Sequence, residues 1–418
     1  MKIFKKDYVQ ALFTKPGSRN TLIVLGGTII NSLIGGLFFV LAPRFIGPEK
    51  YGLFAVVSST GVLIASVANL GIDSGILNFA SKNDSVANRV LKLALESYIV
   101  IGLITFLAGF VLAKPLAQFL GTASLAPLIQ VAFSLVIVFL LTDFFVAVLQ
   151  AREQFAKAFM TSISSNTIRL IILLFGAYFF IIDLPFLTYL FFLVPIVSVI
   201  VGKIFTPTNF LSAKDHRKEF RNFFGFNFWI AASFAVSAFP VDNYMLLKMA
   251  GPIATGLYAA PFKLLSIVDQ LAGNYSRVLA PKISQLDSRE KTMKFIQSTL
   301  PIALPVALIF FVMTFLGSPI VKLILGTSYE QSTLVFSLVS LASLFTFLTA
   351  IPVSITIYHF NAAKVAFVIT LISMAIWIAL NFLLIPTYQQ YGAAVAYLLT
   401  EILILLFHSS YIFYKIRK

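Results

Sequence analysis

Long runs of apolar residues without a single charge constrain this chain more than any other feature of its sequence. Thr21–Phe39, Leu125–Thr142 and Val365–Ile385 contain no charged residue, and the shorter Leu170–Ile182 shows the same pattern. A run of ~18 apolar residues is long enough to cross the hydrocarbon core of a bilayer as a helix. Lipid cannot hydrogen-bond to the backbone, so only helices or closed barrels span it, and these runs are continuous rather than alternating. The sequence therefore predicts an all-α integral membrane protein.

The composition agrees with this fold class. Of the 418 residues, 59% are hydrophobic and 11% are charged, whereas a soluble domain carries about 25% charged residues. The breaks between the apolar segments hold Gly, Pro, Asn and charged residues, which are typical of turns. We therefore expect about twelve transmembrane helices, near Thr21–Phe45, Leu53–Phe79, Leu91–Ala113, Leu125–Gln150, Phe159–Ile181, Pro185–Phe205, Phe224–Lys248, Thr255–Pro281, Phe295–Leu316, Thr333–Tyr358, Val365–Ile385 and Gly392–Tyr414.

Lys and Arg gather in alternate loops between these helices. Both termini and one set of loops are basic, through Lys2, Lys5, Lys6, Lys15, Arg19, Lys82, Arg89, Lys92, Arg152, Lys157, Lys203, Lys214, Arg217, Lys218, Arg221, Lys282, Arg289, Lys291, Lys294, Lys364, Lys415, Arg417 and Lys418. The opposite set holds only Arg44, Lys50, Lys114, Lys248 and Lys322. Basic loops stay in the cytoplasm. We therefore expect a multi-pass protein of the cell (cytoplasmic) membrane with both termini in the cytoplasm. The first apolar run has full spanning length, so we expect it to be retained rather than cleaved as a signal peptide.

The chain repeats itself. Gly47–Ala55 reads GPEKYGLFA and Gly251–Ala259 reads GPIATGLYA, at a separation of 204 residues. We therefore predict two six-helix halves around a central cavity: residues 1–205, a basic cytoplasmic linker at 206–221, and residues 222–418. Halves with an even number of helices share one orientation, and substrate sites in such transporters lie at the repeat interface.

Four segments resemble a known family. They are LAPRFIGPEKYGLFAV (Leu41–Val56), NLGIDSGILNFAS (Asn69–Ser81), VDNYMLLKMAGPIATGLYAAPFKL (Val241–Leu264) and NFLLIPTYQQYGAAVAYLLTE (Asn381–Glu401). They are similar to segments of the polysaccharide (O-antigen, Wzx-type) flippases of the MOP (MATE-like) exporter superfamily. The resemblance implies a transporter that moves a polyprenyl-diphosphate-linked oligosaccharide from the cytoplasmic to the outer leaflet by alternating access, with H⁺ or Na⁺ as a coupling ion. The alternative within the superfamily is a MATE-type, cation-coupled multidrug exporter.

Several charged residues fall inside the predicted membrane spans. A charge at the bilayer centre costs ~2.5–3.5 kcal/mol on insertion scales, so it faces a cavity, pairs, or lies near a helix end. Arg169 lies near the middle of its helix, and arginine binds a diphosphate bidentately. We take Arg169 as the first candidate for substrate binding. The alternative is a buried ion pair with Asp143 from the preceding helix.

The helix predicted at Thr255–Pro281 offers further basic candidates. Lys263 and Arg277 are fourteen residues apart, which places them near one helix face, with Asp269 between them in depth. This arrangement suits a cationic track for a diphosphate. The alternative is that both cations extend toward the headgroups. Arg44, at the end of the first helix, is a fourth candidate for substrate binding, with a headgroup anchor as the alternative.

Five carboxylates are candidates for ion coupling: Asp73, Asp143, Asp242, Asp269 and Glu401. A carboxylate in a partly dry cavity can load and release a proton, because burial favours its neutral form. We favour Asp242, because Pro240 removes a backbone hydrogen bond nearby and frees a carbonyl oxygen for Na⁺ or H⁺. The alternatives are a plain kink beside a polar residue and structural acid–base pairs. The glycines Gly71 and Gly75 indicate close helix packing.

Other chemistries find no support in the sequence. There is no Cys and no Walker A segment, and the three His residues are scattered along the chain. A membrane-embedded glycosyltransferase would need a large extramembrane loop, which the short breaks do not supply. We therefore expect a transporter and not an enzyme, with no cofactor, no metal and no nucleic-acid partner, working as a monomer among membrane lipids.

Overall fold

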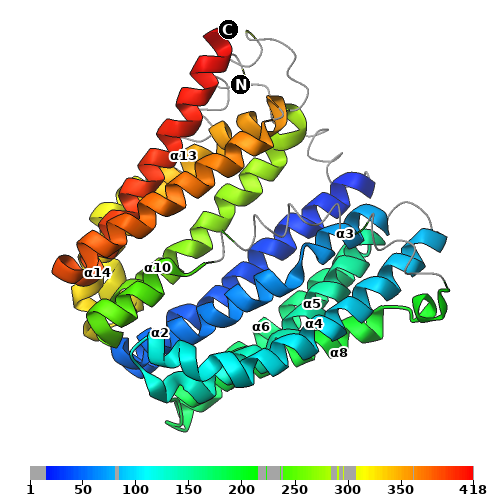
Figure 1. Ribbon diagram of the computed structural model, residues 1–418, viewed down its shortest axis with the longest axis horizontal. Coiled ribbons are helices and arrows are strands. Elements are labelled where there is room, and N and C mark those ends of the chain that lie inside the picture. Colours follow the sequence, from blue (N-terminus) through cyan, green and yellow to red (C-terminus); the bar gives the residue numbers. More distant parts are fainter. Residues whose placement is uncertain are drawn as a thin grey trace. The chain divides into compact units, whose positions relative to one another are not determined.

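The computed structural model describes residues 16–80, 84–214, 239–283, 307–360 and 362–417, with the single positions 223, 236, 290 and 295. Within these ranges all regular structure is helical and no strand occurs (Figure 1). Seven helices are long and apolar enough to cross a membrane. The bent pair Ala307–Phe315 and Gly317–Ile324 makes an eighth if it is one span. Two of the seven correspond to two expected spans each: Lys364–Lys415, with 52 residues, includes both of its spans, and Ile30–Asn69, with 40 residues, covers part of each.

The chain divides into two compact units. Unit 1 comprises Met1–Phe38 and Val57–Phe239, and unit 2 comprises Phe39–Val56 and Pro240–Lys418. The segment Phe39–Val56 thus groups with residues far downstream of it, although it lies in the half predicted at 1–205. Residues 215–221 of the predicted linker lie outside the description, and the domain boundaries predicted from the sequence stay predictions.

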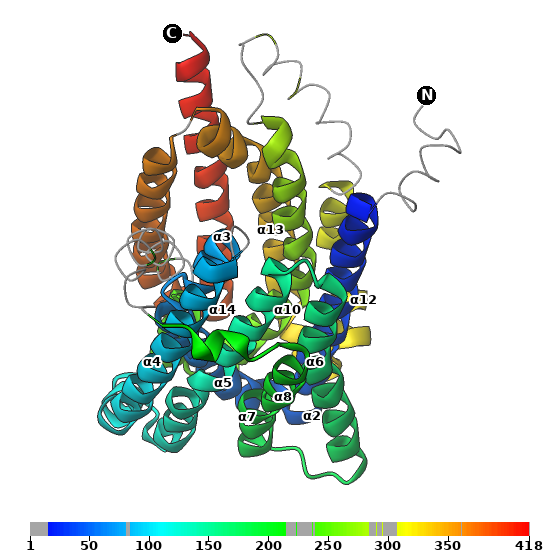
Figure 2. The same cartoon turned by 90° about the vertical axis from the view of Figure 1, so that its right-hand side faces the viewer.

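Unit 1 is built around α5. Its helices are α2 (Pro16–Asn69, as far as Phe38 and again from Val57), α3 (Ile72–Phe79), α4 (Asp84–Phe119), η1 (Ala123–Leu125), α5 (Ala126–Ala151), α6 (Phe155–Tyr178), α7 (Leu184–Leu193), α8 (Ile196–Phe205) and η2 (Asn209–Ser212). Helix α5 packs against α3, α4, α6, α7 and α8 (Figure 2). It carries no charge before Asp143 and is apolar on all sides, as expected of a helix enclosed within a bundle.

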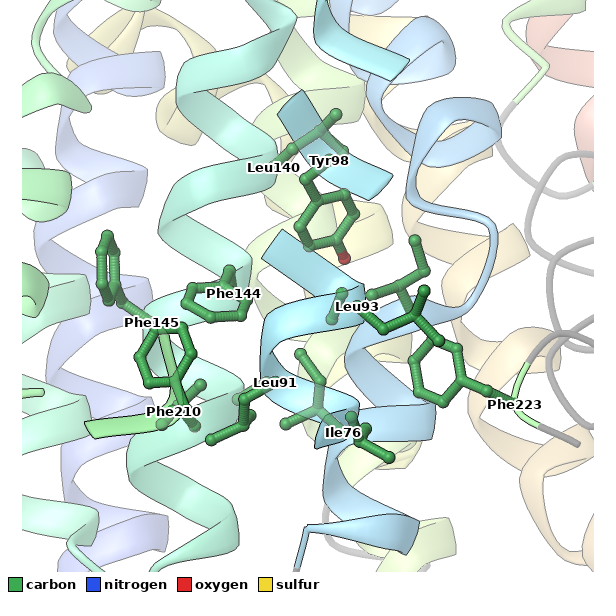
Figure 3. Close-up of a cluster of buried hydrophobic side chains, with 14 of the residues drawn as sticks. Ile76, Leu91, Leu93, Tyr98, Leu140, Phe144, Phe145, Phe210 and Phe223 are labelled. Atoms are coloured by element: carbon green, nitrogen blue, oxygen red, sulfur yellow. The ribbon is translucent and has the colours of Figure 1, made fainter. Parts of the chain in front are cut away.

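An apolar cluster joins α3, α4 and α5. Leu93, Leu140 and Phe144 are buried there, and Phe210 of η2 and Phe223 pack against the same cluster (Figure 3). Among the side chains that Figure 3 labels, Tyr98 is the one with a polar group. The cluster therefore buries a tyrosine ring among apolar side chains.

Unit 2 is built from long helices. They are α10 (Val241–Ile283), α12 (Gly317–Ile324), η4 (Thr327–Ser332), α13 (Thr333–Ser354), the π-helix η5 (Ile355–His359) and α14 (Ala363–Arg417), with Phe39–Val56 of α2. Helices α10, α13 and α14 pack against one another (Figure 1). Helix α14 bends at Gln389, where φ is 48° and ψ is −126°, three residues after Pro386. That bend separates the two spans that the sequence predicts there.

The repeated G-P segments adopt one backbone conformation. Gly47 has φ 73° and ψ 171°, and Gly251 has φ 84° and ψ 178°. Positive φ is open to glycine at no steric cost, so each glycine turns the chain from one helix into the next, and Pro48 or Pro252 follows with its φ preset for the new helix. We name Gly47–Gly52 and Gly251–Gly256 the paired corners.

The paired corners dock onto each other within unit 2. A Cβ added at Gly52 would overlap the carbonyl oxygen of Pro252, and a Cβ added at Gly256 would overlap the carbonyl oxygen of Pro48. The contact is reciprocal, because each corner gives one glycine and one proline carbonyl. Backbones come this close only where no side chain intervenes, so the repeated glycines are required at both positions.

The helix predicted at Leu53–Phe79 is broken. Helix α2 ends at Asn69, and Leu70 and Gly71 have φ of 49° and 68° before α3 begins at Ile72. The span predicted at Pro185–Phe205 is likewise split into α7 and α8 near Pro195. Most of the helix predicted at Phe224–Lys248, and the first part of that predicted at Phe295–Leu316, lie outside the described residues.

Candidate functional site

Arg169, on α6 in unit 1, lies between two aromatic rings. Its guanidinium carbon is 5.4 Å from the ring centroid of Phe38 and 5.0 Å from that of Phe191. Its Nη1 donates to Oδ1 of Asn166 at 3.1 Å and its Nη2 to the carbonyl oxygen of Phe191 at 3.3 Å. Asn166 in turn donates from Nδ2 to Oδ1 of Asn31 at 2.9 Å. The cation is thus held by rings and neutral oxygens.

No counter-ion accompanies Arg169 in the part of the chain that the structure describes. Arg169 is only 6% exposed, and its Nε has no hydrogen-bond partner. Among the described residues no carboxylate pairs with it. Cation–π contact and hydrogen bonds offset part of the cost of burying a charge, but an unpaired buried ion still costs several kcal/mol. The site is therefore suited to an anion that approaches this guanidinium.

This geometry corrects two expectations for Arg169. The alternative of an ion pair with Asp143 is wrong, because Asp143 accepts a hydrogen bond from Asn69 instead. The expectation that Arg169 opens to a cavity also differs from the structure, since the guanidinium is enclosed by Phe38 and Phe191. Aromatic rings thus surround the guanidinium where the sequence led us to expect solvent or a carboxylate.

Two of the predicted carboxylates come together in unit 1. Asp143 of α5 accepts from Nδ2 of Asn69 at 3.4 Å. Asp73, in the first turn of α3, accepts from the backbone N–H of Ser74 at 2.7 Å and lies close enough to Asp143 for their charges to interact. The phenol of Tyr98 is within electrostatic reach of both carboxylates. We name Asn69, Asp73, Tyr98 and Asp143 the break cluster, because they surround the interruption at Leu70–Gly71.

The predicted residues of unit 2 fall in α10 and α14. Lys263 places Nζ 5.0 Å from the ring centroid of Phe39, and its charge interacts with that of Asp242. Asp242 is 5% exposed and is near Tyr258, which is fully buried. Tyr258, Phe262 and Tyr397 form a run of ring contacts beside Lys263. Unit 2 thus combines a cation, a carboxylate and aromatic rings.

The break before Asp242 differs from the expectation. The sequence predicts a break at Pro240. Phe239 and Pro240 indeed lie outside any helix, and α10 begins at Val241. However, the carbonyl oxygen of Pro240 accepts from the N–H of Tyr244, and that of Val236 accepts from the N–H of Phe239. These bonds leave fewer free oxygen atoms for an ion than the sequence led us to expect.

The other predicted residues are dispersed. Arg44 is exposed and donates from Nη1 to the carbonyl oxygen of Leu323, at the end of α12. A cation there compensates the helix dipole, and a role of Arg44 in substrate binding stays a prediction. Glu401 lies in α14 and is half-buried. Asp269 and Arg277 belong to α10, but their side chains lie outside the described residues, so their roles stay predictions.

Sequence reasoning missed the neutral members of these sites. Asn31 and Phe38 hold Arg169 from α2, and Asn69 and Tyr98 complete the break cluster. Asparagine and tyrosine carry no charge and gave no signal by themselves inside apolar spans. The available indication of a break in the sequence was Asn69, a polar residue two positions before the segment Gly71–Asp73.

Comparisons with known proteins agree with the membrane fold. A family profile described as polysaccharide biosynthesis protein matches residues 18–287. The capsular polysaccharide biosynthesis protein CapF of Staphylococcus aureus is 27% identical over 179 residues. That match spans 42% of this chain and 44% of CapF, so it covers less than half of the relative.

Two solved structures have the same fold over nearly the whole chain. The lipid II flippase MurJ in an inward closed conformation gives a TM-score of 0.75 at 17% identity, covering 94% of this chain and 87% of MurJ. An inward-facing multidrug resistance MATE family transporter of the MOP superfamily gives 0.68 at 11% identity, covering 92% and 94%. The predicted fold class, an all-α membrane protein of the MATE-like kind with about twelve spans, is confirmed.

Proposed function

This chain belongs to the polysaccharide biosynthesis protein family, and on that premise we propose that it flips a polyprenyl-diphosphate-linked oligosaccharide across the cell membrane. The resemblance to polysaccharide flippases of the MOP superfamily, read from the sequence, is confirmed by the family match and the shared fold. Transport runs from the cytoplasmic to the outer leaflet by alternating access and is coupled to Na⁺ or H⁺. The names of the similar proteins, a capsular polysaccharide biosynthesis protein and a lipid II flippase, support a lipid-linked glycan as cargo.

The observation that carries the proposal is the buried, unpaired charge of Arg169. Nothing in its described surroundings neutralises it, and two rings shield it from water. The diphosphate is the anionic part of the proposed cargo, and both of its adjacent phosphates carry negative charge. Arginine keeps its charge in a low-dielectric site and binds phosphate oxygens bidentately. Reaching the guanidinium requires Phe38 or Phe191 to move aside.

A drug exporter is less consistent with this site. Organic cations are attracted by carboxylates and aromatic faces, and a fixed guanidinium repels them. Among the residues that the structure describes, no acidic side chain pairs with Arg169 to reverse that repulsion. The anionic diphosphate of the proposed cargo therefore complements the positive charge of Arg169, whereas the organic cations carried by a MATE-type drug exporter do not.

Complementation tests the proposal. A bacterial strain that lacks its lipid-linked glycan flippase would receive wild type, Arg169→Lys or Arg169→Gln at matched membrane levels, with surface glycan as the readout. We expect wild type to restore the glycan, Arg169→Gln to lose it, and Arg169→Lys to be intermediate. A hydrogen bond to a charged group contributes ~1.5–3 kcal/mol, so we expect roughly tenfold or greater loss.

The matched control is Lys322→Gln. Lys322 pairs with Glu330 at 2.7 Å, and both side chains are well exposed, at 46% and 62%. Such a pair contributes at most ~1 kcal/mol, so the control should transport normally. If wild type failed to restore surface glycan for several glycan types and instead made the cells resistant to cationic dyes, the drug exporter would be the better assignment.

A further inference from the structure

The break in α2 has two features of an ion site in a transporter. Helix α2 ends at Asn69 and α3 begins at Ile72, with Leu70 and Gly71 in the left-handed region between them. The last carbonyl groups of a helix have no partner within it, and the negative end of the helix dipole lies there. Transporters use the interrupted ends of such helices to coordinate Na⁺. Two carboxylates, Asp73 and Asp143, lie beside this break.

The charges at the break are unbalanced. Among the described residues, neither Asp73 nor Asp143 forms an ion pair. Lys92 on α4 donates from Nζ to the carbonyl oxygen of Ala213 at 3.0 Å. Two interacting carboxylates without a cation repel each other, because each negative charge disfavours the charged form of the other. A bound cation would remove that repulsion.

Two buried oxygen atoms beside these carboxylates have no partner. Asn69 is 7% exposed and uses its Nδ2 on Asp143, which leaves Oδ1 without a hydrogen bond. Tyr98 is 0% exposed, and its hydroxyl oxygen also has no partner. That hydroxyl lies near the backbone of Asp73 and within electrostatic reach of both carboxylates. Buried polar atoms normally find a partner, so these two oxygen atoms point to a missing ligand.

We infer that the break cluster of Asn69, Asp73, Tyr98 and Asp143 is a Na⁺ site in unit 1. Carboxylate, amide and hydroxyl oxygens are the ligands that hard cations prefer. Asp143 is exposed, which gives the ion a way in, whereas Ile72 and Phe144 beside it are fully buried and keep the other side dry. The inference deepens the ion coupling of the proposed function, on which it rests for its role in transport.

Direct binding tests the site without any lipid-linked substrate. Purified full-length protein in nanodiscs would be titrated with ²²Na⁺ at constant ionic strength in choline chloride. We expect saturable binding to wild type, at least tenfold weaker binding to Asp143→Asn, and a smaller, several-fold weakening in Tyr98→Phe, which removes only the hydroxyl oxygen. The near-isosteric changes keep the size of each side chain.

The matched control is Glu330→Gln, an exposed carboxylate of unit 2 that pairs with Lys322 at 2.7 Å and should bind Na⁺ as wild type does. Binding lost in Asp242→Asn, the buried carboxylate of unit 2, but kept in Asp143→Asn would overturn the site, and so would the absence of saturable Na⁺ binding to wild type. Complementation by wild type separates the two proposals. Glycan restored without Na⁺ binding would leave the flippase standing and remove the Na⁺ site.

Discussion

At the scale of single residues, the proposed role of Arg169 in substrate binding would come at the expense of stability. Burying an unpaired charge costs several kcal/mol, and an apolar side chain of similar length removes that cost. Two hydrogen bonds, to Asn166 and Phe191, are lost in exchange, each with a net contribution of ~1 kcal/mol. The cost of burying the charge therefore exceeds the stabilisation that these two hydrogen bonds provide.

Arg169→Met should accordingly be stable but inactive. We expect the purified variant to unfold at the wild-type temperature or above it in detergent, while surface glycan is lost in the complementing strain. Ser164→Ala on the same helix, which loses a hydroxyl contact to Ser198 at 3.3 Å, serves as the control and should keep its activity. Marked destabilisation of Arg169→Met would mean that Arg169 is a structural residue.

The charged residues could be predicted from the sequence, but their partners could not. Arg169, Asp73 and Asp143 were recognisable because a charge inside an apolar span is rare. Which of them meet depends on the rotation of each helix about its axis, which is set by packing. Asp143 consequently faces Asn69 of α2 rather than Arg169 of α6.

At the scale of helices, the paired corners demand glycine at two positions. A Cβ at Gly52 or Gly256 would meet a backbone carbonyl, which cannot rotate away as a side chain can. Overpacking of this kind costs typically ~1–3 kcal/mol. The two positions share one contact, so their effects should not be additive.

Gly52→Ala and Gly256→Ala should therefore each lower the thermal stability of the purified protein, and the double variant should lose less than the sum. Gly26→Ala provides the control, since a Cβ there meets nothing within 4 Å and alanine favours helix. If all three single variants were equally stable, the contact between the paired corners would not contribute to the stability of the protein.

Helix interruptions were harder to predict than helices. Pro240 marked one of them in the sequence, because proline removes a backbone donor, whereas the split between α7 and α8 near Pro195 was not predicted. The break at Leu70–Gly71 contains no proline, and Gly71 also suited close packing, which is how the sequence was interpreted. Leucine at φ 49° is uncommon, so tertiary contacts rather than local preference impose this conformation.

At the scale of the whole molecule, the basic loops predict which side of the membrane each turn faces. The chain has no cysteine, so single cysteines report their own position to an impermeant thiol reagent. Phe180, between α6 and α7, is 95% exposed, and Lys157 lies near the start of α6. We expect Phe180→Cys to be labelled in intact cells and Lys157→Cys only after the membrane is opened. The reverse pattern would invert the proposed orientation.

The number and nature of the spans followed from hydrophobicity, because lipid leaves helices as the only solution for continuous apolar runs. The grouping of Phe39–Val56 with Pro240–Lys418 did not follow from it. Hydrophobic patterns record which segments enter the membrane, whereas the contacts between segments depend on surface shape, such as the glycine gaps at the paired corners.

The reciprocal contact of the paired corners also has an evolutionary consequence. If an ancestral protein had only six helices, two identical copies would have formed this contact as an isologous homodimer, in which each glycine faced the partner's proline. Duplication and fusion of that gene would then have preserved the interface inside one chain. In either repeat, a side chain in place of the glycine would meet the backbone carbonyl of the other repeat's proline, so the contact would constrain both copies alike.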